Sequence, residues 1–211
     1  MPITDVSLLA LVDEPMLFAP LVKATIPDLY ESFQAATVAT PGLHVTLHEF
    51  LVAPGHAKLQ AALDWCEQSG AALVAHVTRL GMARFAARTL IRSRRGATLM
   101  LSSESSDGWL CAVDTACSRI TAPLFARRPG RPERLHLTLA RSPELDLREG
   151  AVEHHRVDVV IDLNRFCLAL ATALPYGQIR WLTTSGRLEV ADRCGENANR
   201  GDGQATPPRT P

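Results

Sequence analysis

The tetrapeptide pattern His-x-Thr-Leu occurs twice in this chain, at residues 44–47 and 136–139. Each copy lies in a run where apolar and polar residues alternate, over residues 43–47 and 135–139. Successive side chains of a strand point to opposite faces. Each run therefore predicts a strand whose Leu and Val side chains enter a core while His and Thr face the other way. Two such strands can bring two imidazoles and two hydroxyls to one cleft, enough to move protons on both sides of a phosphate.

The rest of the chain predicts an α+β fold. Apolar residues at Leu59, Leu63 and Cys66 have the spacing of an amphipathic helix, which Gly70 is expected to end. Short apolar runs between turn residues predict further strands. The expected helices cover residues 26–36, 56–69 and 107–120, and the other expected strands cover 7–12, 73–80, 83–93, 97–103 and 157–162, with a strand pair at 178–190.

The charge balance limits the kinds of partner. Lys plus Arg and Asp plus Glu both number 22, so the formal net charge is zero. A protein that grips a long nucleic acid through many phosphates usually has a clear basic excess. We therefore expect a small or local phosphate target rather than a long duplex, and zero net charge is still compatible with positive charge in one cleft.

Cysteine usage and hydropathy indicate the compartment. The five cysteines form no CxxC pair, and four of them lie in apolar runs, which is typical of reduced, buried thiols in a cytoplasmic protein. No apolar run approaches the roughly 18 residues of a membrane span, and no signal peptide is expected at the N-terminus. We predict one domain over residues 1–190 and a disordered tail over 191–211, where apolar residues nearly vanish.

These motifs resemble the signature of the two-histidine (2H) phosphoesterase superfamily, which includes the LigT-type 2′-5′ RNA ligases and cyclic nucleotide phosphodiesterases. The signature is a pair of H-x-[ST]-x motifs with hydrophobic flanks, and here the two histidines are 92 residues apart. The second copy, followed by Ala140 and Arg141, is very close to the LigT form. The order of expected helices and strands also fits over about residues 5–190.

The resemblance implies two pseudo-symmetric lobes, each an antiparallel sheet with helices packed on its outer face, and an active-site cleft between them. It implies that His44 and His136 act as general acid and base, and that Thr46 and Thr138 donate hydrogen bonds to phosphate oxygens. Either histidine can take either role. We expect no metal ion and no cofactor. The expected partner is a nucleotide or an RNA end, bound by a monomer without contact to a membrane.

Several further residues are candidates for substrate binding. His48 is expected on the same strand face as His44, although residues four apart on a strand are about 13 Å apart and too distant to share a metal ion. Arg141 follows the second motif and is expected to reach the rim of the cleft. Four arginines crowd the loop before the second motif, where guanidinium groups can attract phosphate: Arg127, Arg128, Arg131 and Arg134.

The leading functional hypothesis is a metal-independent phosphodiesterase that hydrolyses 2′,3′-cyclic or 2′-5′-linked nucleotides, with 2′-5′ ligation as the reverse reaction. A cyclic oligonucleotide signal of an immune pathway is an alternative substrate. A non-catalytic module that binds RNA or phosphate on the same fold is an alternative from another class. A third is a metal-dependent hydrolase that uses the histidines as ligands.

Overall fold

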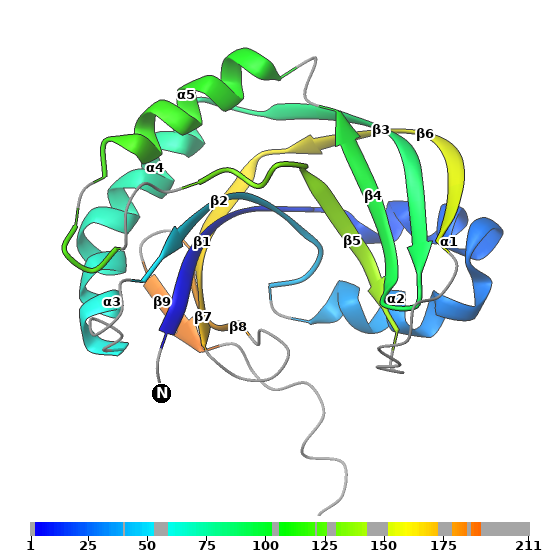
Figure 1. The fold of residues 1–211 in the computed structure, drawn as a ribbon, viewed down its shortest axis with the longest axis horizontal. Helices are drawn as coiled ribbons and strands as arrows, with labels where there is room; N and C mark the ends of the chain where they lie inside the picture. The colour runs from blue at the N-terminus through cyan, green and yellow to red at the C-terminus, as the bar shows by residue number, and fades with distance from the viewer. Residues whose placement is uncertain are drawn as a thin grey trace, which may run out of the picture.

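The computed structural model describes residues 3–39, 41–52, 59–102, 106–120, 122–125, 130–142, 152–172, 179–184 and 187–190. Within this part of the chain, nine strands form one antiparallel sheet in the order β6-β3-β4-β5-β2-β1-β7-β8-β9 (Figure 1). The strands are β1 (Ile3–Leu11), β2 (His44–Leu51), β3 (Ala83–Ser93), β4 (Gly96–Ser102), β5 (His136–Arg141), β6 (Glu153–Leu163), β7 (Arg165–Thr172), β8 (Ile179–Thr184) and β9 (Arg187–Val190).

The sheet consists of two halves that join at β2 and β5. Among the described residues, one pair is in register between these two strands, Val45 with Leu137. The neighbouring strands pair over longer stretches, with β1 on β2 and β4 on β5. The two His-x-Thr strands, one from each half, therefore lie side by side at the centre of the sheet (Figure 1). The predicted pair of lobes is present as two halves of one continuous sheet.

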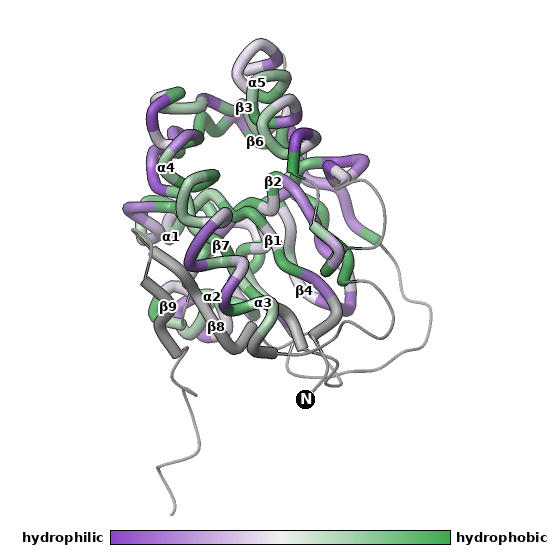
Figure 2. The backbone as a smooth tube through the Cα atoms, turned by 90° about the vertical axis from the view of Figure 1, so that its left-hand side faces the viewer, coloured by the Kyte–Doolittle hydropathy of each residue, from purple (hydrophilic) through white to green (hydrophobic). Residues whose placement is uncertain are grey.

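The helices contribute apolar side chains to one buried cluster. They are α1 (Ala19–Thr25), α2 (Tyr30–Val38), α3 (Leu59–Trp65), α4 (Ala71–Arg79) and α5 (Asp107–Ser118), with short 3₁₀ turns at Pro15–Phe18 and Pro27–Leu29. Helix α2 packs on β5 and α4 packs on β7. Phe33 and Val74 from these helices join Val45 and Leu137 in one buried cluster. Hydrophobic stretches (green in Figure 2) run through β1 and the helices. The opposite face of β2 and β5 carries the polar residues of both motifs.

The α+β class is confirmed, but the structure differs from the predictions in several places. Residues 73–80 are not a strand, because α4 follows α3 through a π-helical turn at Cys66–Gly70. Gly70 does not end the helix: a Cβ there would lie 2.5 Å from Leu168 Cδ1, so glycine allows the helix to approach β7 closely. Strand β7 was missed altogether, and β6 begins at Glu153, four residues before the start of the strand predicted at 157–162.

No helix among the described residues is long and apolar enough to cross a membrane. The predicted tail, residues 191–211, lies outside the described part of the chain.

Candidate active site

The two motif histidines converge at the junction of the half-sheets. The antiparallel pair of Val45 and Leu137 fixes the register. One residue to either side of it, His44 lies opposite Thr138 and Thr46 lies opposite His136. Val45 and Leu137 are fully buried, so the four polar side chains lie on the other face. The histidines are then diagonal neighbours, a relation that separates residues by about 7–8 Å. That spacing leaves room for one phosphoryl group between the imidazoles.

Both imidazoles are held in the same way by the backbone two residues earlier. His44 Nδ1 lies 2.8 Å from the carbonyl oxygen of Gly42, and His136 Nδ1 lies 3.2 Å from the carbonyl oxygen of Arg134. A carbonyl only accepts, so each Nδ1–H donates. This arrangement selects the tautomer and leaves each Nε2 available for proton transfer.

The surroundings of the two histidines differ. His44 is half-buried and His136 is exposed. Burial lowers the pKa of His44 below its ordinary value of 6.5, the hydrogen bond to Gly42 opposes this, and the positive charges of Arg141 and His136 lower it further. A buried imidazole next to cations favours the neutral form. At neutral pH, His44 is therefore suited to accept a proton.

A β-bulge after each motif decides which later side chains face the site. In β2, Leu8 pairs with His48 but Leu9 pairs with Thr46, so Leu47 is an extra residue. An extra residue reverses the alternation that follows it. His48 is consequently buried, with 3% of its surface exposed, and it faces the core. The prediction that His48 shares a face with His44 was wrong for this reason.

His48 connects β2 to other parts of the structure instead. Its Nε2 lies 3.3 Å from Asp114 Oδ1 on α5, and Asp114 Oδ2 lies 3.3 Å from the guanidinium of Arg131. Burial lowers the pKa of His48, while the carboxylate of Asp114 opposes that shift. The ring also contacts Phe50, with centroids 5.7 Å apart. His48 thus helps to hold α5 and the segment that leads into β5.

The second bulge, in β5, has the opposite consequence for Arg141. Thr98 pairs with Thr138 and Ala97 with Ala140, so Leu139 is the extra residue. Ala140 is buried, and Arg141 returns to the face of the motif residues, where its charge acts on His44. Strict alternation would direct Arg141 into the core.

Sequence reasoning missed Glu49, which occupies in β2 the position that Arg141 occupies in β5, five residues after the histidine. The bulge directs Glu49 outward, where it is exposed and interacts electrostatically with His136. Loss of hydration raises the pKa of Glu49, Asp5 adds to the shift, and His136 opposes it. Its signal in the sequence was the shared spacing: both histidines are followed at the fifth position by a charged residue.

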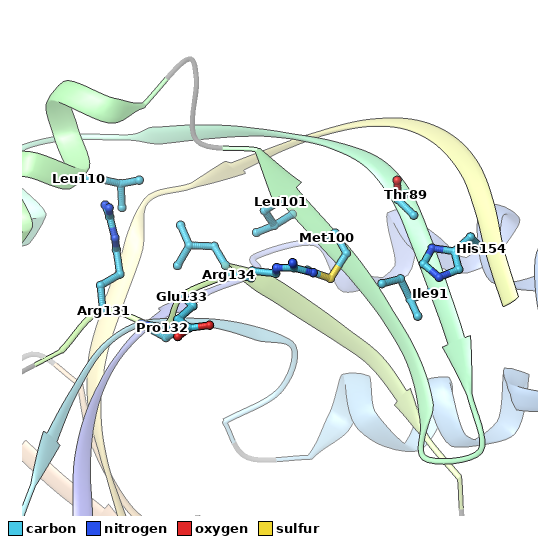
Figure 3. A pocket seen from close by; sticks show the side chains of 11 residues that line it. Thr89, Ile91, Met100, Leu101, Leu110, Arg131, Pro132, Glu133, Arg134 and His154 are labelled. Carbon is cyan, nitrogen blue, oxygen red and sulfur yellow. The ribbon is translucent and has the colours of Figure 1, made fainter. Parts of the chain in front are cut away.

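Of the four predicted loop arginines, Arg134 lies beside His136, whereas Arg131 pairs with Asp114 on α5. Arg127 and Arg128 lie outside the described residues. Arg134 is exposed, and its carbonyl accepts the hydrogen bond from His136. The side chains of Arg131 and Arg134 line a cavity of about 430 Å³ next to this segment (Figure 3).

Three of the described cysteines are buried and do not form a second reactive centre. Cys66, Cys117 and Cys167 are buried free thiols, and burial raises the pKa of each to about 12. Such thiols stay protonated near neutral pH and are poor nucleophiles. Within the described ranges, no group of three or more His, Cys, Asp or Glu residues is placed to hold a metal ion.

Comparison with known proteins identifies relatives of the fold. No protein-family model and no curated protein matches the chain. A crystal structure of TT0787 from Thermus thermophilus matches with a TM-score of 0.50 and 15% identity over 86% of this chain and 98% of that one. E. coli LigT complexed with 3′-AMP has a TM-score of 0.43 and 14% identity over 90% and 99% of the two chains. At these identities the likeness is one of fold, and at this level the predicted resemblance is confirmed.

Proposed function

We propose that this protein is a phosphodiesterase that opens 2′,3′-cyclic phosphates or cleaves 2′-5′ linkages by general acid and base catalysis. The observation that carries the proposal is the pairing of β2 with β5, which makes His44 and His136 diagonal neighbours on the polar face of the sheet. Histidine suits both roles because its ordinary pKa lies near neutrality.

In the proposed reaction, Nε2 of His44 takes a proton from water as the water oxygen attacks phosphorus. The bond from phosphorus to the 2′ or 3′ oxygen breaks, and that oxygen receives a proton from Nε2 of His136. Thr46 and Thr138 donate hydrogen bonds to the non-bridging oxygens, whose negative charge is concentrated during the reaction. The product is a phosphate monoester, and exchange with solvent then removes the added proton from His44 and returns one to His136.

The residues after the two bulges support this assignment of roles. Arg141 lies near His44 and disfavours a second positive charge there, whereas Glu49 lies near His136 and attracts one. The half-sheets have similar backbones but opposite charges at these matching positions. We therefore assign the base to His44 and the acid to His136, with Arg141 and Glu49 as positioning residues that act through charge.

The direct test is turnover of adenosine 2′,3′-cyclic phosphate by the purified chain in the presence of EDTA. We expect a single monoester product and the same rate with and without the chelator, because the proposed proton transfers use only side chains. Loss of activity in EDTA that zinc restores would support the metal-dependent hydrolase instead. RNA binding that persists without the two imidazoles, with no turnover, would support the non-catalytic module.

The assignment of roles predicts how the pH profile of kcat/KM changes. The acidic limb reports protonation of the base and should lie below pH 6.5, since the pKa of His44 is lowered. Arg141→Gln removes a cation from beside His44, so this limb should move to higher pH. Glu49→Gln should leave this limb in place, because Glu49 interacts with His136 rather than with His44. The shift in Arg141→Gln is expected to be about 0.2–0.7 pH unit, the size of a partly exposed charge interaction.

Profiles measured on both variants separate this assignment from the reverse one. If His136 were the base, Glu49→Gln would move the acidic limb and Arg141→Gln would leave it in place. Profiles that keep their shape in both variants would contradict any role for these two charges.

A further inference from the structure

His48 is a buried histidine that the proposed proton transfers do not use. Its Nε2 lies 3.3 Å from Asp114 Oδ1 on α5, and its Nδ1 has no hydrogen-bond partner among the described residues. A buried N–H without an acceptor is unfavourable, so the neutral ring carries its proton on Nε2, next to the carboxylate. Burial lowers the pKa of His48 and keeps the ring neutral at neutral pH. His48 is therefore a fixed donor directed at α5.

Asp114 extends this contact to the segment that leads into β5, residues 130–135. Its second carboxylate oxygen, Oδ2, lies 3.3 Å from the guanidinium of Arg131. Figure 3 shows the Arg131 side chain extending from this segment toward Leu110, which precedes Asp114 on the same helix. The two charged side chains are 40% and 35% exposed, and an ion pair so accessible to water contributes little by itself. The buried imidazole restricts the carboxylate and so gives this pair a defined position.

The backbone of β2 holds the same segment directly beside His48. The N–H of Glu49 donates to the carbonyl of Gly130 at 2.8 Å, and the N–H of Gly130 donates to the carbonyl of Glu49 at 3.0 Å. Two adjacent residues of β2 are thus connected to two adjacent residues of the segment, Gly130 through the backbone and Arg131 through Asp114. The start of the segment is fixed to the half-sheet that does not carry His136.

The other end of the segment carries the group that orients His136. The N–H of Leu101 on β4 donates to the carbonyl of Leu135 at 3.0 Å. Arg134, one residue earlier, has the carbonyl that accepts the Nδ1 proton of His136 at 3.2 Å. Because this carbonyl lies between the two attached ends, its direction depends on where the segment begins.

We propose that His48 is a positioning residue for His136. Its neutral imidazole, through Asp114 and Arg131, fixes the start of the segment 130–135. The segment in turn holds the carbonyl that selects the tautomer of His136 and leaves Nε2 available to the phosphate. The inference rests on the proposed function, and it means that one half-sheet prepares the proton donor of the other.

The test compares two substitutions that differ in one property. His48→Gln keeps an N–H donor near the position of Nε2, whereas His48→Leu fills the space without a donor. Asp114→Ala cuts the same contact from the more exposed side and replaces His48→Leu if that variant does not fold. The control for lost packing is Val22→Ala, a fully buried position on α1, which packs on α2 and the short turns beside it.

The first measurement is the tautomer of His136, obtained from its ring ¹⁵N shifts by NMR about two pH units above the ordinary pKa of 6.5. Wild type, His48→Gln and Val22→Ala should show a single form with the proton on Nδ1. His48→Leu and Asp114→Ala should show a mixture of both tautomers, because the accepting carbonyl no longer stays in place. A single tautomer in either folded variant, or a mixture in His48→Gln or Val22→Ala, would overturn the proposal.

The second measurement separates kcat from KM for adenosine 2′,3′-cyclic phosphate. A misplaced proton donor affects the chemical step, so His48→Leu should lose about 10–100-fold in kcat while KM changes by less than about twofold. His48→Gln should keep kcat within about threefold of wild type. Equal kcat values for His48→Leu and wild type would overturn the role of His48. If wild type turns over no substrate, the proposed function fails, and the tautomer of His136 still decides whether His48 positions that ring.

Discussion

We expect His44→Ala and His136→Ala each to lower kcat/KM for adenosine 2′,3′-cyclic phosphate by about 10²–10⁴-fold, because each removes one proton transfer. The two half-sheets supply one imidazole each, so neither can replace the other. The folded structure should survive, since both side chains lie on the polar face rather than in the core. Steady-state kinetics measures the change in kcat/KM, and circular dichroism on each variant checks that the fold is kept.

The matched control is His76→Ala, an exposed histidine in the last turn of α4. It should keep full activity, which would show that losing a histidine as such is harmless. Wild-type rates in either motif variant would exclude the two-histidine mechanism, whatever the other variant did.

The second large effect concerns stability and lies at Gly96, where β4 begins. Its φ of +132° is outside the range that side chains readily adopt, and a Cβ there would lie 2.8 Å from Arg141 Cα and even closer to the carbonyl oxygen of Ala140. Gly96→Ala should therefore lower the free energy of unfolding by at least about 3 kcal/mol, from backbone strain and the clash with β5. Urea unfolding monitored by fluorescence gives the difference.

Gly81→Ala separates the two causes. Gly81 also has a positive φ, of +83°, but among the described residues nothing lies within 4 Å of the position its Cβ would take. That variant should lose only about 1–2 kcal/mol, the cost of the left-handed backbone. Equal losses of unfolding free energy in the two variants would mean that the contact between a Cβ at residue 96 and β5 costs nothing.

The pairing of the strands explains which parts of the site could be predicted from the sequence. The alternation in each motif is local, so the sequence correctly placed Val45 and Leu137 in the core and the histidines in strands. Beyond each motif the same rule failed, because a bulge inserts one residue. His48, predicted to face the substrate, is buried, and Glu49, which strict alternation would direct into the core, faces the site.

The helix at 71–79 illustrates the same limit. Its apolar residues also suited a short strand, and only packing separates the two possibilities: Leu73, Val74 and Val77 are all buried at helical spacing. Gly70, a typical helix end in sequence, is instead a point of close contact with Leu168. Contacts between segments far apart in the chain overrode a local signal in each case.

The sequence alone determined that two strands each present a histidine and a threonine on one face, because the period of a strand depends only on neighbouring residues. The tertiary structure decided that these strands are adjacent, that Glu49 and Arg141 lie near opposite imidazoles, and that a cavity adjoins His136. Register, bulges and cavities depend on how distant segments pair. The free energy of that pairing depends on both segments, so neither segment predicts it alone.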